Sequence, residues 1–379
     1  MKVLVNAPSV KEGGSLVVLD QLLKRMRQIR NGIEWVVAIH PTVRRLQRDE
    51  WDFVQVDVGN FDSNPLGVLR WYNVALPAAV ERSKADLVFS ITNYLPFLKL
   101  KIPTVLLVQH AGHFSKKFDD LYRQHLQRPD RVAAWVMKTR WVERSVRTAK
   151  EVTVQTATLA DAIAMRTGRP RERIHAIPHG PGCLVTPTQV VRSRQDGCPV
   201  RIGYITKFGV QKNFEVLFDA VARLIRDGRA VRLVLTLAAN LPENARLIQR
   251  AEAVGIGRAL ENVGEIDARR ISALYDSLDV FAFPSMVESF GFPLVEGMTK
   301  GLPIAAADTL SNREIAGEAA LFFPPTNAEV LAGIIGELID NPSLRATRSA
   351  AAFRRAQAFS WDRAAQQTLA LFDMAVGAI

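Results

Sequence analysis

The segment FPSMVESFGFPLVEGMTKG (283–301) has the pattern of a strand, a glycine-bearing loop and a helix. Its first apolar residues are typical of the end of a buried strand, and Pro293 favours the first turn of a helix. Glu288 and Glu296 are separated by seven residues, so one carboxylate is expected in the loop and the other about one turn into the helix. The segment therefore predicts two acids that flank the N-terminus of a helix.

This arrangement suits a ligand that carries both negative charge and hydroxyl groups. The N-terminus of a helix attracts an anion such as phosphate, and Gly291 permits close approach of the backbone. The carboxylates of Glu288 and Glu296 would accept hydrogen bonds from neutral hydroxyls, as in a ligand with sugar hydroxyls on both sides of a diphosphate. Spacing alone equally allows Glu288 to cap the helix and Glu296 to stabilise its dipole.

Similar strand–helix alternation extends in both directions from this segment. Short β-branched runs that predict buried parallel strands alternate with amphipathic segments that predict helices. A stretch rich in Pro and Gly at 177–200 separates two such series, which together predict two doubly wound α/β domains. The expected strands lie at 3–6, 35–39, 86–90, 104–109, 151–155, 201–206, 231–237, 279–285, 302–308 and 320–325.

Size and composition are consistent with two domains. The chain has 379 residues, 48% of them hydrophobic, and no apolar run approaches the length of about 20 residues that a membrane span needs. Its beginning, MKVLVNAPSV, is typical of a first strand and not of a signal peptide, which predicts a cytoplasmic protein.

Positive charge is concentrated in the first half of the chain. The formal net charge is +11, and residues 1–195 carry 30 Lys and Arg against 17 Asp and Glu, so this half alone has a net charge of +13. Such an excess favours an anionic partner, which could be a nucleic acid, a membrane surface or a phosphorylated substrate. A nucleic-acid partner is not supported, because no recognition motif accompanies the charge.

Three further clusters are candidate site residues. Lys207 and Lys212 follow a predicted strand and could supply point charges to a diphosphate, although solvated surface lysines give the same pattern. Gly13 and Gly14 open the first predicted helix, where a phosphate or a sugar could bind, but they do not form a dinucleotide fingerprint. His110 follows a central strand, a place where a lone His is more often structural. No Cys/His cluster or Asp pair has metal-ligand spacing, so no metal is expected.

Together these segments resemble the retaining GT-B nucleotide-sugar glycosyltransferases of glycosyltransferase family 4. The resemblance covers nearly all of the second half and is thinner in the first. Its motifs are ESFGFPLVE (288–296) after FPS (283–285), YITKFGVQKN (204–213), ENVGEI (261–266), KGLPIAAAD (300–308), NREIAGEAALFF (312–323), IPHG (177–180) and FSW (359–361).

The resemblance implies an organisation and a set of roles. Two Rossmann-like domains would face a central cleft, with an acceptor domain at 1–185, a linker at 186–200, a nucleotide-sugar domain at 201–358 and a helix at 359–379 that crosses back. In the donor site, Glu288 would hold sugar hydroxyls, the backbone of Ser289, Phe290, Gly291 and Phe292 would meet the diphosphate, and Glu296 would bind the ribose. Lys207, Lys212, His110, Gly13 and Gly14 would surround the phosphates and the sugar, and the base would pack near Val263 and Ile266. Lys207 stands where the family usually has Arg. A lysine keeps the positive charge but lacks the bidentate hydrogen-bonding fork of an arginine.

The acceptor side is expected in the basic segment 114–150, where ten Lys and Arg oppose four acids. Its aromatic residues Phe114, Phe118, Tyr122, Trp135 and Trp141 suggest a membrane interface, although Trp135 and Trp141 could instead lie in the core. The residues expected to meet the acceptor or an anionic inner membrane surface are Lys116, Lys117, Tyr122 and Arg123.

The sequence thus predicts a metal-independent retaining hexosyltransferase without a cofactor, acting in bacterial surface polysaccharide synthesis such as that of lipopolysaccharide. General likeness favours mannose from GDP-mannose and a glycan or lipid-linked acceptor. Three alternatives remain: a UDP-sugar transferase with a soluble acceptor, a GT-B nucleotide-sugar epimerase, and a binding protein without turnover. The two Glu residues argue against the epimerase, and the intact donor motifs argue against the binding protein.

Overall fold

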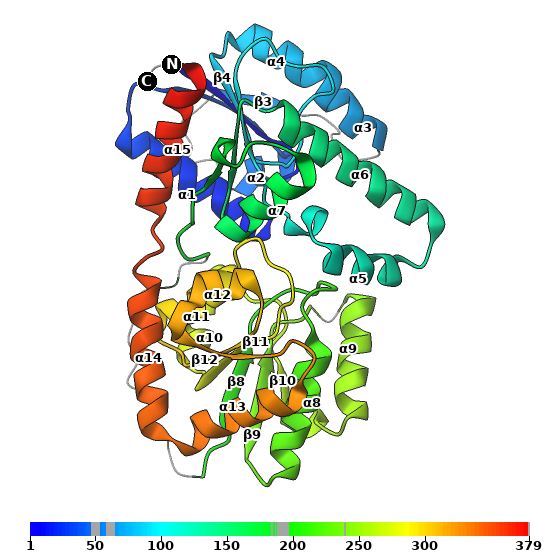
Figure 1. The fold of residues 1–379 in the computed structure, drawn as a ribbon, viewed down its shortest axis with the longest axis vertical. Helices are drawn as coiled ribbons and strands as arrows, with labels where there is room; N and C mark the ends of the chain where they lie inside the picture. Colours follow the sequence, from blue (N-terminus) through cyan, green and yellow to red (C-terminus); the bar gives the residue numbers. More distant parts are fainter. Residues whose placement is uncertain are drawn as a thin grey trace. The chain divides into compact units, whose positions relative to one another are not determined.

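The structure is a computed structural model that describes residues 1–46, 54–57, 65–182, 185, 187, 197–238 and 240–377. The chain forms two compact units, one of Met1–Asp119, Leu126–Gly180 and Ser360–Ile379, and one of Asp120–His125 and Pro181–Phe359 (Figure 1). Most of the predicted linker at 186–200 lies outside the described residues.

The first unit is built on a parallel sheet of seven strands in the order β3-β2-β1-β4-β5-β6-β7. Its strands are β1 (Lys2–Ala7), β2 (Glu34–Ile39), β3 (Val54–Asp57), β4 (Leu87–Ser90), β5 (Thr104–Leu107), β6 (Glu151–Val154) and β7 (Ile174–Ala176). Its helices are α1 (Gly13–Ile29), α2 (Pro41–Leu46), α3 (Pro65–Arg70), the π-helical η1 (Trp71–Ala75), α4 (Leu76–Ser83), the 3₁₀ turn η2 (Ala111–Phe114), α5 (Lys116–Leu126), α6 (Pro129–Thr148), α7 (Ala157–Thr167), the 3₁₀ turn η3 (Arg171–Arg173) and α15 (Trp361–Val376). Residues Asp120–His125 of α5 group with the second unit.

The second unit has a parallel sheet of six strands in the order β10-β9-β8-β11-β12-β13. Its strands are β8 (Val200–Tyr204), β9 (Val231–Leu235), β10 (Leu260–Asn262), β11 (Val280–Phe283), β12 (Ile304–Ala307) and β13 (Ala320–Phe323). Its remaining elements are α8 (Phe214–Arg226), α9 (Pro242–Ala253), η4 (Gly257–Ala259), α10 (Ala268–Asp276), α11 (Phe292–Thr299), α12 (Leu310–Ala316), η5 (Gly317–Ala319), α13 (Ala328–Asp340) and α14 (Pro342–Ala356).

Every predicted strand is present, and both sheets are parallel and doubly wound, as the sequence pattern indicated. The strand order reverses between β1 and β4 in the first sheet and between β8 and β11 in the second. Ligands of such sheets bind beyond the carboxyl ends of the strands at the point of reversal. The loops after β8 and β11 are therefore the first place to look for a site in the second unit.

The C-terminal helix α15 completes the first unit by packing along α1 (Figure 1). Phe372 is fully buried, and its ring meets the rings of Phe89 and Trp35 at centroid distances of 5.1 and 6.4 Å. Arg30, which follows α1, donates two hydrogen bonds of 2.7 and 2.6 Å to the carboxylate of Asp373. The chain therefore ends as a core element of the unit in which it begins.

Truncating the aromatic anchor of α15 should destabilise the first unit. We expect Phe372→Ala to lower its free energy of unfolding by about 3–5 kcal/mol, because it leaves a cavity between strands and helix. Denaturant unfolding followed by tryptophan fluorescence measures this. Gln367→Ala, at an exposed position of the same helix, should change it by less than about 0.5 kcal/mol; equal effects of the two variants would contradict the packing argument.

Candidate functional site

The loop after β8 is held by hydrogen bonds from side chains at its two ends. Tyr204, the last residue of β8, is fully buried and donates its hydroxyl to the carbonyl oxygen of Lys212 at 3.0 Å. Burial and the nearby Glu288 carboxylate raise the pKa of Tyr204 well above its usual value, so it stays a neutral donor. Asn213, which precedes α8, has a φ of +56° and donates its amide to the carbonyls of Pro284 and Pro325 at 3.2 and 2.7 Å. The backbone of Lys212 is thereby held in one position.

Two further loops at this edge are tied to the first. The backbone N–H of Met286, after β11, donates to the carbonyl of Gln211 at 2.9 Å. The buried amide of Asn312, on α12, donates to the carbonyls of Ser285 and Ala307 at 3.0 and 2.9 Å. Hydrogen bonds thus connect the loops that follow β8, β11 and β12.

Lys212 and Glu288 meet between these loops. The ammonium of Lys212 lies 2.5 Å from Oε1 of Glu288, and the side chains are only 13% and 12% exposed. The hydroxyl of the buried Ser285 donates to the same oxygen at 2.6 Å. Within the described residues, both polar contacts of this carboxylate fall on Oε1. Its second oxygen, Oε2, is the atom that can accept a hydrogen bond from a hydroxyl of a ligand.

Glu296 lies deeper than the sequence suggested. It is on α11, which begins after Gly291 (φ +82°), and it is only 3% exposed. The hydroxyl of the fully buried Tyr275 donates to Oε2 at 2.6 Å, and a Cβ at Gly182 would collide with Oε1. Tyr275 and Gly182 therefore orient this carboxylate, and neither was predicted from sequence.

Lys207 does not join Lys212. Its ammonium lies 3.2 Å from the carboxylate of Glu265 in the loop after β10, and both side chains are more than half exposed. The same loop holds Val263, whose N–H donates to the carbonyl of Leu235 at 2.9 Å, and the half-buried Ile266. An exposed pair of this kind contributes about 0–1 kcal/mol, so a phosphate group can compete for the ammonium at little cost.

In the first unit, His110 is held by aromatic side chains. It is exposed after β5, and its ring meets the edge of Phe118 at a centroid distance of 5.1 Å. Beside it, His113 stacks on Trp135 at 4.4 Å and shares a 2.9 Å hydrogen bond with Thr139. Burial, and then the neighbouring His110, lowers the pKa of His113 to about 3, so His113 is neutral at pH 7.

Glycines shape both predicted loops of this unit. A Cβ at Gly112 would collide with the rings of His110 and Phe118, so glycine is required there. Gly13 begins α1 with a φ of +66°, and Gly14 is exposed in its first turn. Gly112, like His113, was not singled out from sequence, because only the fold brings the rings around it.

The expectation of an aromatic membrane face on 114–150 is wrong for most of its rings. Phe114, Phe118 and Trp135 are buried, and Trp141 donates its indole N–H to the carbonyl of Leu95 at 2.8 Å within the packed interior. Phe118, Trp135 and Trp141 lie on α5 and α6, and an amphipathic helix turns its apolar side chains inward. Lys116, Lys117 and Arg123 remain exposed, and Tyr122 is half-buried.

Across the described residues, no group of three or more His, Cys, Asp or Glu side chains is placed to hold a metal ion. None of the helices in this part of the chain combines the length and the apolar character needed to cross a bilayer.

Two family models match consecutive parts of the chain. The model Glycosyltransferase Family 4 matches residues 12–181, and the model Glycosyl transferases group 1 matches residues 188–355. The crystal structure of Anabaena HepE in complex with UDP-glucose matches with a TM-score of 0.74 and 20% identity over 99% of this chain and 100% of that chain. The fold is therefore GT-B, and the class of protein is a hexosyltransferase. The chain belongs to the group 1, family 4 glycosyltransferases.

Two curated relatives are similar to the chain in sequence. The chain is 27% identical over 301 residues to an MMP alpha-(1->4)-mannosyltransferase of Mycolicibacterium hassiacum, a match of 76% of this chain and 69% of the relative. It is 29% identical over 124 residues to the O-antigen chain mannosyltransferase B of Escherichia coli, which covers 33% of this chain and 32% of that protein. These matches agree with the family that the two models show, and they leave the substrates as proposals.

The Lys212–Glu288 pair should behave as one unit in stability. We expect Lys212→Met and Glu288→Gln to be non-additive, with a coupling of about 0.5–3 kcal/mol, because either change alone leaves a half-buried charge without its partner. Denaturant unfolding of the single and double variants measures the coupling. The exposed pair Lys207→Met and Glu265→Gln serves as control and should couple by about 0–1 kcal/mol. Additive effects at Lys212 and Glu288 would refute the pairing.

Proposed function

We propose that this enzyme transfers a hexose, with mannose from GDP-mannose as first choice, to a glycan or lipid-linked acceptor in bacterial surface polysaccharide synthesis. The observation that carries the proposal is the Ser285–Lys212–Glu288 cluster at the strand-order reversal of the second sheet, which leaves one carboxylate oxygen for a sugar hydroxyl. Both of these relatives are mannosyltransferases, which supports the choice of sugar, and the E. coli relative is an O-antigen chain mannosyltransferase, which supports a surface polysaccharide.

In this proposal the positive groups of the site stabilise the negative charge that develops on the leaving diphosphate. When the bond between the sugar and the diphosphate opens, the electron pair stays on the phosphate oxygen, and positive groups must stabilise it. Lys212, Lys207 and the N-terminal end of α11 around Ser289, Phe290, Gly291 and Phe292 supply that charge without a metal ion. Glu288 would hold the hydroxyls of the sugar through Oε2, which leaves it no free position from which to attack the anomeric carbon.

The remaining donor contacts follow from position. Glu296 would bind the ribose through Oε1, the oxygen that faces Gly182 and not Tyr275. The base would pack on the loop of Val263 and Ile266. His110 and the Gly13–Gly14 turn of the first unit would meet the sugar and the phosphates, and the acceptor would bind near Lys116, Lys117, Tyr122 and Arg123. Retention of configuration is proposed from the family resemblance alone, since the described residues of this site place no second acid as a nucleophile.

A UDP-sugar donor is the second candidate, because the HepE structure, with the same fold, is a complex with UDP-glucose. The two candidates share the diphosphate and ribose contacts and differ in the base and the sugar. Val263, in the loop proposed for the base, is 38% exposed, so this loop is accessible to a base. Binding of free GDP and UDP therefore tests which base the loop accepts.

Thermal shifts against GDP-mannose, UDP-glucose, GDP and UDP in EDTA will identify the donor. A ligand at about 100 times its dissociation constant should stabilise the protein by about 2.7 kcal/mol. Glu288→Gln should lose most of the shift from the nucleotide sugar and keep that from the nucleotide, and Glu296→Gln should weaken both. Glu329→Gln, an exposed acid of the same unit, is the control. No shift by any of the four ligands, or one that requires a divalent ion, would refute the donor site.

The cations of α5 are expected to bind an anionic membrane surface. In vesicle flotation, Lys116→Glu/Lys117→Glu should weaken binding to vesicles of phosphatidylglycerol several-fold, at about 1 kcal/mol per charge near the surface. The control Lys24→Glu/Arg258→Glu reverses two exposed charges elsewhere and should leave binding nearly unchanged. If both double variants bind as the wild type does, α5 has no role at a membrane.

A further inference from the structure

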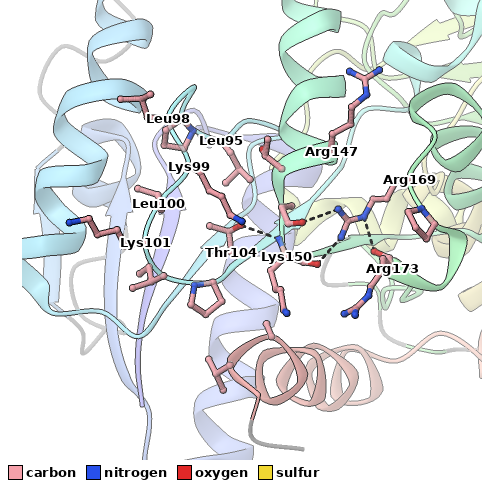
Figure 2. Close-up of a pocket in the computed structure, with 18 residues that line it drawn as sticks. Leu95, Leu98, Lys99, Leu100, Lys101, Thr104, Arg147, Lys150, Arg169 and Arg173 are labelled. Carbon is pink, nitrogen blue, oxygen red and sulfur yellow. Dashed lines mark hydrogen bonds between the residues drawn. The ribbon is translucent and has the colours of Figure 1, made fainter.

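A cavity lies at the amino edge of the first sheet, away from the residues proposed to bind the sugar donor. Its volume is about 590 Å³, and it is lined by residues from 95–104, 147–150, 169–173 and 375–376 (Figure 2). These segments precede β5, β6 and β7 or end the C-terminal helix α15. Gly13 and His110, in contrast, follow strands β1 and β5 and belong to the carboxyl edge. The cavity is therefore separate from the proposed sugar-transfer machinery of this unit.

All charged residues that line the cavity are cations. They are Lys99, Lys101, Arg147, Lys150, Arg169 and Arg173, and no Asp or Glu lines it. Two of them have acidic partners outside the lining: Arg173 pairs with the fully buried Glu151, and Arg147 lies 3.6 Å from Glu143. Like charges gathered in one hollow repel one another, and a bound anion would relieve that repulsion.

Arg169 provides a rigid frame for these charges. Its guanidinium donates to the carbonyls of Val146, Ala149, Lys150 and Arg173 at 2.7–3.1 Å. The backbone N–H of Lys150 also donates to the carbonyl of Thr104 at 3.0 Å. The end of α6, the start of β5 and the start of β7 are thereby joined, and Lys150 projects from a fixed backbone (Figure 2).

Two lysines of the cavity have ammonium groups available for a ligand. In the described part of the chain, the side chains of Lys99 and Lys150 form no hydrogen bond or ion pair, and both residues are exposed. Figure 2 shows Lys99 extending from its loop toward Thr104 and Lys150, whereas Lys101 points away. Lys99 and Lys150 therefore line one cavity from two different segments.

We propose that this cavity is a binding site for a phosphate ester, contacted by Lys99 and Lys150 on the frame that Arg169 makes. An ammonium is a compact point charge with three donors and binds phosphate without a fixed orientation. The proposal does not rest on the proposed donor or acceptor, because no residue is shared with either site.

The apolar neighbours bear on the source of the phosphate. Leu98, next to Lys99, is 80% exposed, and Phe97 is 40% exposed. An exposed apolar side chain beside cations is the arrangement found where proteins meet a bilayer, with the cations at the headgroups. The headgroup of an anionic lipid and a soluble phosphate ester offer the same chemistry to the two lysines, and the experiment separates them.

The test compares Lys99→Glu/Lys150→Glu with the charge-matched control Lys24→Glu/Arg258→Glu in the full chain. One arm measures co-sedimentation with vesicles of phosphatidylglycerol and of phosphatidylcholine, and the other measures the thermal shift with sn-glycerol 3-phosphate. The cavity variant should bind either phosphatidylglycerol vesicles or sn-glycerol 3-phosphate at least about tenfold more weakly than the control does.

Loss confined to the phosphatidylglycerol arm, reproduced in part by Leu98→Ser, assigns the site to a lipid headgroup. Loss in the glycerol phosphate arm assigns it to a soluble ester. If the cavity variant and the control behave alike in both arms, the proposal is overturned. The shift produced by the nucleotide sugar, measured on the same variants, should be unchanged, so failure of this site and failure of the donor site are distinguishable.

Discussion

The candidate donor site depends on the hydrogen bonds that hold three loops at the carboxyl edge of one parallel sheet. A parallel sheet delivers strand ends to one edge, but the loops that follow have no ladder to hold them. Asn213 and Asn312 each donate to two backbone carbonyls from different loops, and Tyr204 holds the carbonyl of Lys212. Buried carbonyls without partners are costly in free energy, so other arrangements of these loops, which would break these hydrogen bonds, are less stable.

The Lys212–Glu288 pair is placed by that framework and also completes it. Two half-buried opposite charges are stable only while both remain, and Ser285 adds a donor to the same carboxylate oxygen. One oxygen is thus used for structure and the other is left for a ligand. Glu296 is also oriented by its neighbours, because Tyr275 donates to one of its oxygens and Gly182 lies against the other.

The first unit organises its polar groups differently. His110 stands against the rings of Phe118 and Trp135, so aromatic packing contributes to its position. The positive charge of this unit is also not confined to the basic segment 114–150. A group of cations gathers at the amino edge of the sheet, where Arg169 uses its guanidinium as a structural brace.

Apolar periodicity, which is a local property, by itself determined the two parallel sheets, and the resemblance of the motifs to family 4 glycosyltransferases pointed to the family and the candidate residues. The strands β3, β7 and β10 escaped prediction, since three or four residues at or next to a sheet edge carry little pattern. Only the tertiary structure decided that Lys212 pairs with Glu288 while Lys207 pairs with Glu265, and that Phe114, Phe118 and Trp135 are core residues. It alone revealed Tyr275, Asn312 and Gly182 in the site. Such contacts join residues far apart in the chain, and their geometry is set by how strands order themselves in a sheet, which no local pattern records.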